Sequence, residues 1–168
     1  MLEMKSSKNK KKKVCFVTHD YSFFKIYLIN LSIEISEIHD VTVITDTQNV
    51  TNKDLTFLKE NNITLKHLDQ RSNTNRLKII KYIYALKKIV KNVDPEYIFY
   101  TTVEMAFFGS LITEFKTARK SFFVITGIGL DFFSKRLRHK ILNLIYFITF
   151  KLNKFKQNTS YIFQNYED

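Results

Sequence analysis

The sequence contains little glycine, proline or cysteine and no tryptophan: its 168 residues include three Gly, one Pro and one Cys. The single cysteine, Cys15, excludes an internal disulfide and any metal site built from several cysteines. Because Cys15 lies inside an apolar run, we expect a buried and unreactive thiol. The scarcity of Pro and Gly also leaves no segment with the composition of a flexible linker.

Acidic residues are scarce relative to basic ones. Lys and Arg number 27 against 16 Asp and Glu, which gives a formal net charge of +11. Such a charge predicts attraction to an anionic partner: nucleic acid, an anionic membrane leaflet or a diphosphate-linked substrate. Residues 1–13, which include the run Lys8–Lys13, are expected to form a solvated, disordered tail because like charges repel one another.

No apolar run is long enough to cross a membrane. The longest, Ile141–Phe150, falls well short of the ~20 residues that a spanning helix needs. The basic start leads into a strand pattern rather than into the apolar segment of a signal peptide. Hydrophobic residues still make up 45% of the chain, enough for a sizeable core. We therefore expect a cytoplasmic protein with one folded domain over residues 14–168.

Short β-branched runs alternate with longer helical periods along the chain. Strands are expected at Val14–Thr18, Val41–Thr45, Ile63–Leu68, Tyr97–Tyr100, Ser121–Ile125 and Ser160–Phe163. Helices are expected at Phe23–Glu37, Thr51–Asn61 (with a capping box at its start), Arg76–Lys91, Ala106–Phe115 and Ser134–Lys156. This alternation predicts an α/β fold, a Rossmann-like doubly wound parallel sheet with helices on both faces.

The helix expected at Arg76–Lys91 has the clearest amphipathic pattern. Its expected buried stripe consists of Ile79, Ile80, Ile83, Leu86, Ile89 and Val90. Lysines lie away from that stripe, as in a helix that packs one side on a core.

Ligands bind doubly wound sheets at the carboxyl ends of the strands, so residues that follow the strands are the candidates. His19 and Asp20 follow the first strand, where His19 is either a general base or a solvent-facing turn histidine. Gly127 and Gly129 follow the fifth, where a Gly-x-Gly marks a close approach to a ligand or only a change of chain direction. The four histidines share no metal-ligand spacing, so no metal site is expected.

The segment Ser134–Lys156 combines dense basic charge with Phe, Tyr and Ile. It is either a core-packed helix with a charged outer face or a helix docked on an anionic membrane. Charge alone also allows nucleic-acid binding. However, no helix-turn-helix, zinc knuckle or RNA-binding aromatic pair is recognisable, so nucleic acid is not the expected partner.

The order of these landmarks resembles the N-terminal half of a GT-B glycosyltransferase of family 4, of the kind that builds bacterial surface polysaccharides. The resemblance covers about Val14 to Asp168. It rests on five motifs: Asp20-Tyr21-Ser22-Phe23-Phe24, Asp40-Val41-Thr42-Val43-Ile44-Thr45, Val93-Asp94-Pro95-Glu96-Tyr97-Ile98, Thr126-Gly127-Ile128-Gly129 and Phe163-Gln164-Asn165-Tyr166-Glu167-Asp168. The last two are the most specific, because they occur together in the family's order and separation.

This resemblance implies transfer of a sugar from a nucleotide-sugar to an acceptor, commonly a lipid-diphosphate-linked saccharide at the inner face of the plasma membrane. In that fold two Rossmann-like domains face each other across a cleft, and the N-terminal domain holds the acceptor. The residues implied in acceptor binding are Asp20, Phe23, Phe24, Lys25, Thr126, Gly127 and Gly129, with Asn165 and Asp168 near the interdomain edge. No cofactor is implied for this domain.

Two positions depart from the family pattern: Tyr27-Leu28 replaces a His-Arg pair and Glu104-Met105 replaces a Lys-Pro pair. The donor-binding C-terminal domain is expected to be missing or separate, so the isolated half is expected to be inactive. Two rival hypotheses are a non-catalytic, membrane-associated subunit that recruits a donor-binding partner and a basic nucleic-acid-binding domain.

Overall fold

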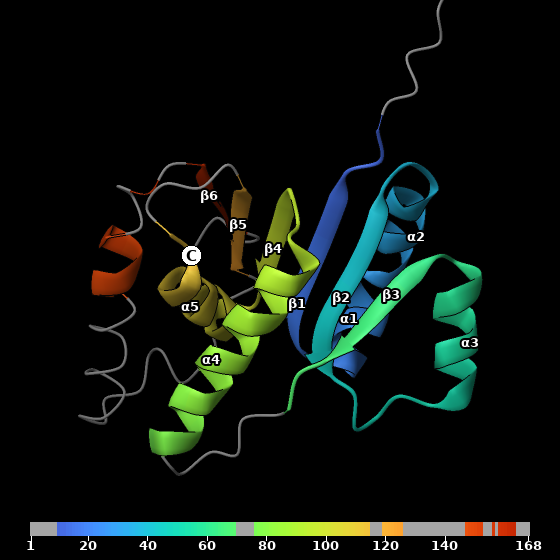
Figure 1. Ribbon diagram of the computed structural model, residues 1–168, viewed down its shortest axis with the longest axis horizontal. Helices are drawn as coiled ribbons and strands as arrows, with labels where there is room; N and C mark the ends of the chain where they lie inside the picture. The colour runs from blue at the N-terminus through green and yellow to red at the C-terminus, as the bar shows by residue number, and fades with distance from the viewer. Residues whose placement is uncertain are drawn as a thin grey trace, which may run out of the picture.

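The computed structural model describes residues 10–69, 76–114, 119–125, 147–152, 156 and 158–163. Its strands form one sheet in the order β3-β2-β1-β4-β5-β6, and every neighbouring pair is parallel (Figure 1). The strands are β1 Lys13–Asp20, β2 Asp40–Asp46, β3 Ile63–His67, β4 Tyr97–Thr101, β5 Lys120–Ile125 and β6 Thr159–Phe163. The predicted Rossmann-like α/β fold is therefore confirmed.

Helices cover both faces of this sheet. They are α1 Tyr21–Tyr27, α2 Ile29–Ile38, α3 Asn52–Glu60, α4 Arg76–Val93 and α5 Val103–Ile112. From β1 the chain moves outward to β2 and β3, then crosses to β4 and moves the other way. Right-handed connections therefore place the two sets of helices on opposite faces. In Figure 1, α4 and α5 lie in front of the sheet and α1 and α2 behind it.

The side chains of β1 alternate between two hydrophobic cores. Val14 and Phe16 pack in the core beneath α1, α2 and α3, whereas Cys15 and Val17 belong to the core beneath α4 and α5. This alternation follows from the two-residue period of a strand. Cys15 is fully buried, and burial raises the pKa of its thiol far above the ordinary value. The thiol is buried and un-ionised, as expected.

Two helices differ from the sequence-based expectation. The helix expected at Phe23–Glu37 is broken at Leu28, whose backbone φ and ψ of −121° and −12° separate α1 from α2. Helix α5 begins earlier than the expected Ala106, because the Thr102 side chain caps it by accepting from the Met105 amide. The capping box of α3 is confirmed: Thr51 and Asp54 bind each other's backbone amides.

The buried face of α4 was also predicted incorrectly at one position. Ile80 is 64% exposed, while Tyr82 is buried in its place. The Tyr82 ring packs on Phe108 of α5, with ring centroids 5.2 Å apart, and its hydroxyl lies 3.4 Å from the Met105 Sδ. Because α4 packs against α5 as well as the sheet, its buried face is rotated toward Tyr82.

Only part of the basic segment expected to be helical lies within the described residues. Residues 147–152 are helical, and Phe150 packs on the core beneath α4 and α5. The Lys156 ammonium donates to the carbonyl of Ser110 in α5, and burial lowers its pKa. Among the described helices, none combines the length and apolarity needed to cross a bilayer.

Candidate functional site

The sheet reverses its direction of growth between β1 and β4, which are hydrogen-bonded neighbours. After β1 the chain passes into α1 on one face, and after β4 it passes into α5 on the other. In α/β proteins, ligands bind where such connections diverge, outside the carboxyl ends of the strand pair. This edge of β1 and β4 is here called the crevice. The Thr101 hydroxyl donates to the Val17 carbonyl over 3.0 Å and holds the two strand ends together.

Asp20 ends β1 and caps helix α1. Its Oδ1 accepts a hydrogen bond of 2.8 Å from the Phe23 amide, which satisfies one of the free donors at the start of the helix. Its Oδ2 contacts Nε2 of His19. The carboxylate is therefore fixed by the backbone on one side and faces the imidazole on the other.

His19 is held in one orientation by this carboxylate. With Nε2 directed at Asp20, a neutral ring carries its proton there and leaves a lone pair on Nδ1. Nδ1 is buried and has no hydrogen-bond partner among the described residues. A carboxylate that orients an imidazole is a recurring arrangement for proton transfer. Because Nδ1 has no exposed surface in this conformation, a hydroxyl at the crevice reaches it only when the side chains around it move.

Three rings, those of His19, Phe23 and Tyr27, lie in series from the crevice along α1 and are here called the aromatic ladder. The His19 and Phe23 ring centroids lie 5.5 Å apart, and those of Phe23 and Tyr27 lie 4.9 Å apart. The four-residue spacing places Phe23 and Tyr27 on one side of α1, and the His19 ring at the end of β1 lies next to Phe23. Tyr27 is 65% exposed. Sequence reasoning did not include Tyr27 in the site, although its helical spacing from Phe23 was a usable signal.

Phe24 does not face the crevice. Its side chain has no exposed surface and packs against Tyr21 in the core beneath α1, α2 and α3. Helical geometry explains the difference, because adjacent residues point about 100° apart around the axis. Phe24 anchors α1 to the sheet and cannot touch a ligand in this conformation.

Lys25 is engaged by helix α3 rather than by the crevice. Its Nζ donates over 2.7 Å to Oδ1 of the buried Asp54. Lys25 and the two hydrogen bonds from Thr51 hold the pKa of the Asp54 carboxyl well below its usual range. Burial, together with the nearby Asp54 charge, raises the pKa of Tyr21 to about 12. Lys25 thus ties α1 to α3.

Thr102, between β4 and α5, has strained backbone geometry. Its φ is 80° and its ψ is 152°, a region populated almost only by glycine. The other non-glycine residues described with positive φ are Asn62, Asp94 and Asn158, types that tolerate it better. Such strain clusters at binding and catalytic sites, and here it lies beside the crevice. The pattern of the sequence gave no signal for it.

We expect Thr102→Gly to raise the free energy of unfolding by about 1 kcal/mol, because relief of backbone strain outweighs the entropy that glycine adds to the unfolded chain. Urea denaturation measures the change. Thr102→Ala is the matched control: it also removes the hydroxyl that caps α5 but keeps a Cβ in the strained conformation, so it should lower stability. Destabilisation of equal size in both variants contradicts strain at Thr102.

The remaining predicted site residues, Thr126, Gly127, Gly129, Asn165 and Asp168, lie outside the described residues. The strands that precede them are placed. Ile125 at the end of β5 pairs in register with Phe163 at the end of β6. Both strands run parallel to β1 and end at the same edge of the sheet.

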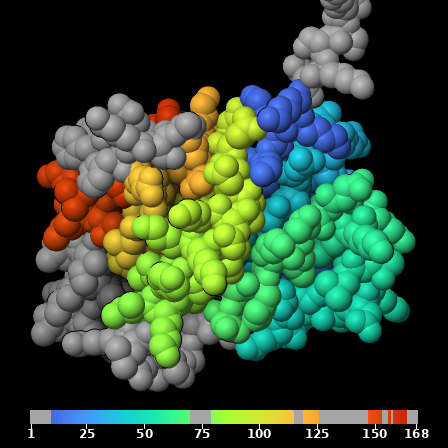
Figure 2. All heavy atoms as spheres, in the orientation of Figure 1, coloured from blue at the N-terminus to red at the C-terminus, as the bar shows by residue number. Residues whose placement is uncertain are grey.

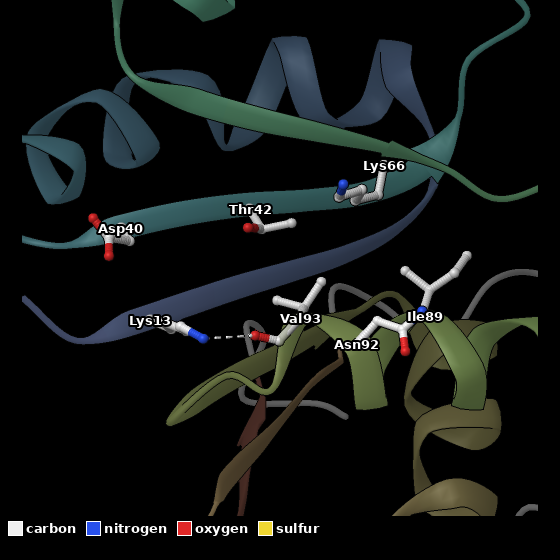
Figure 3. Close-up of a pocket in the computed structure, with 7 residues that line it drawn as sticks. All are labelled: Lys13, Asp40, Thr42, Lys66, Ile89, Asn92 and Val93. Carbon is white, nitrogen blue, oxygen red and sulfur yellow. Dashed lines mark hydrogen bonds between the residues drawn. The ribbon is translucent and has the colours of Figure 1, made fainter.

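A groove of about 280 Å³ lies at a different place. Figure 3 shows Lys13, Asp40 and Lys66 of the strands facing Ile89 and Val93 of α4 across it. Lys13 and Asp40 are the first residues of β1 and β2, so the groove extends to the amino ends of these strands. It is therefore separate from the crevice.

The sheet order and the parallel register define a Rossmann-like domain. A family model described as glycosyl transferase 4-like matches residues 13–165, and the chain belongs to that family. No curated protein sequence matches it significantly.

A solved glycosyltransferase has a similar fold. A glycosyltransferase from Rickettsia africae ESF-5 superposes with a TM-score of 0.53 at 12% identity, over 93% of this chain and 44% of that one. The glycotransferase of kitacinnamycin gives a TM-score of 0.47 at 12% identity, over 85% of this chain and 39% of that one. The chain thus spans less than half the length of either protein.

Proposed function

We propose that this chain is the acceptor-side domain of an enzyme that transfers a sugar from a nucleotide-sugar to a lipid-linked saccharide in surface polysaccharide synthesis. Family membership supports sugar transfer. The observation that carries the acceptor role is the His19–Asp20 pair at the crevice, with the Phe23–Tyr27 ladder beside it. Sugar transfer requires a proton to leave the acceptor hydroxyl, and the His19–Asp20 pair would accept it once acceptor binding uncovers the buried Nδ1 of His19.

The aromatic ladder would contact the acceptor's sugar ring. Flat aromatic side chains offer a large apolar surface, while the polar groups at the strand ends fix orientation. Stabilisation of the departing nucleotide diphosphate requires cationic or hydrogen-bonding groups facing the crevice from a second domain. The isolated chain is therefore expected to bind an acceptor but not to transfer sugar.

Acceptor binding is tested by titrating the chain with a short-chain prenyl diphosphate-linked saccharide and following the His19 ring signals by NMR. Tyr27→Ala should weaken binding about tenfold, as expected for loss of one aromatic contact. Phe57→Ala is the control, since Phe57 is an exposed aromatic residue on α3, away from the crevice. Equal affinities of the two variants, or no change at His19, would contradict the proposed site.

A second experiment tests whether this chain binds the acceptor but needs a second domain for sugar transfer. The isolated chain is incubated with nucleotide-sugars and the same acceptor. The expected result is acceptor binding without product. Efficient transfer by the isolated chain would show that the donor site also lies within these 168 residues.

A further inference from the structure

The outer side of α4 carries a continuous stripe of exposed side chains. Its members are Ile80, Lys81, Tyr84, Lys87, Lys88 and Lys91, here called the α4 surface. Their spacing follows the helical period, so they lie in one line. Figure 2 shows α4, in yellow-green, across the middle of this face of the molecule. Ile80 and Tyr84 are 64% and 71% exposed, although both have large apolar side chains.

Charge is strongly segregated in this molecule. Helix α4 contains six basic residues and no acidic one. Helices α1, α2 and α3 together contain three basic residues and four acidic ones. Because α1, α2 and α3 lie on the opposite face, their acidic residues, such as the exposed Glu34 and Glu37, are kept away from α4. Helix α4 therefore carries more positive charge than α1, α2 and α3 together, and it attracts anions more strongly.

Further exposed apolar residues lie on the same side of the sheet. Leu111 of α5 is exposed, as are Phe147, Ile148 and Leu152 of the helical segment 147–152. That segment packs through Phe150 on the core that α4 also covers. The opposite face also exposes large apolar side chains, among them Ile26, Ile38 and Phe57. What distinguishes α4 is the run of lysines beside Ile80 and Tyr84, a combination characteristic of surfaces that bind lipid bilayers.

From this arrangement we infer that the α4 surface docks on an anionic lipid bilayer. The lysines contact the headgroups, Tyr84 lies at the interface and Ile80 enters the acyl region. A nucleic acid would satisfy the lysines but leave Ile80 without an apolar partner.

Helix α4 follows β3, so Ile80 and Tyr84 lie toward the edge of the sheet that carries His19 and Asp20. The inference does not rest on the proposed sugar chemistry, since docking needs neither donor nor acceptor.

Vesicle binding tests the charged part of this surface. The chain should co-sediment with vesicles of phosphatidylcholine and phosphatidylglycerol but not with phosphatidylcholine alone, and added salt should release it. Lys87→Gln with Lys88→Gln should lower the partition coefficient about 30-fold, at about fivefold per lysine. The matched control, Lys53→Gln with Lys59→Gln, removes the same charge from α3 and should change it less than threefold. Equal losses in the two double variants overturn the inference.

Insertion of the apolar part is tested with a fluorescent label. Because Cys15 is buried with a raised thiol pKa, a cysteine introduced at an exposed position is labelled selectively. A polarity-sensitive dye on Ile80→Cys should shift to the blue when anionic vesicles are added. The same dye on Phe57→Cys, on the opposite face, should not. If duplex DNA binds more tightly than vesicles and the dye at position 80 does not shift, the surface binds nucleic acid and the lipid inference is wrong.

Discussion

Replacing Gly109 with alanine is expected to lower the free energy of unfolding by about 3 kcal/mol, at the upper end of the usual cost of overpacking a core. A Cβ at this position would lie 2.4 Å from Cγ of Tyr100 and 2.5 and 2.6 Å from its Cδ atoms. Gly109 lies in the middle of α5, so its role is not to form a turn. The missing side chain lets α5 approach the ring on β4.

Tyr100 cannot move aside to relieve this clash. Its side chain is 1% exposed, and its ring stacks on Phe123 of β5 with centroids 5.5 Å apart. Urea denaturation of Gly109→Ala against Leu111→Ala, an exposed position on the same helix, measures the cost. In the double variant Gly109→Ala with Tyr100→Leu, the losses should be less than additive. A near-neutral Gly109→Ala would show that α5 and β4 are less closely packed than described.

The second large effect is expected from Asp54→Asn. This exchange should lower the free energy of unfolding by about 2 kcal/mol, because the capping box and charge-assisted hydrogen bonds are lost. Asp54 accepts from the Thr51 amide over 3.0 Å, from the Thr51 hydroxyl over 2.6 Å and from Lys25 over 2.7 Å. The Lys25 side chain is 57% exposed, so its ion pair with Asp54 contributes only a small part of this loss of stability. Urea denaturation at neutral pH measures the loss.

The same carboxylate makes stability depend on pH. Its pKa is lower in the folded than in the unfolded chain, so its contribution is complete above the unfolded value of about 3.9 and is lost as pH falls below it. Asp54→Asn should flatten this part of the stability curve. Asp69→Asn is the control, since the Asp69 side chain is 96% exposed. Equal flattening in both variants would exclude Asp54 as the main source.

Much of the fold could be predicted because it is encoded locally. The β-branched runs predicted all six strands, and the Thr51–Asp54 spacing predicted the capping box of α3. Strand alternation with short connections then predicted the parallel, doubly wound sheet, because few topologies satisfy the handedness of such connections. The position of His19 and Asp20 at a ligand-binding edge followed from that topology.

The identities of the contacts at the site could not be predicted in the same way. Lys25 was expected at the crevice but pairs with Asp54, a residue from a different helix. Tyr27 was regarded as a departure from the family pattern, yet it extends the aromatic ladder. Thr102 adopts a backbone conformation that its residue type disfavours. Each outcome depends on which elements pack side by side.

The sequence by itself determined the strands, the helices and their alternation, since hydrophobic period and capping act over a few residues along the chain. The tertiary structure decided which sides of those elements are buried. It placed Tyr82 inside and Ile80 outside, set Gly109 against Tyr100 and put the basic helix α4 on the opposite face of the sheet from α1, α2 and α3. Such contacts join residues distant in sequence, so their energies become defined only when the sheet and its two layers of helices assemble.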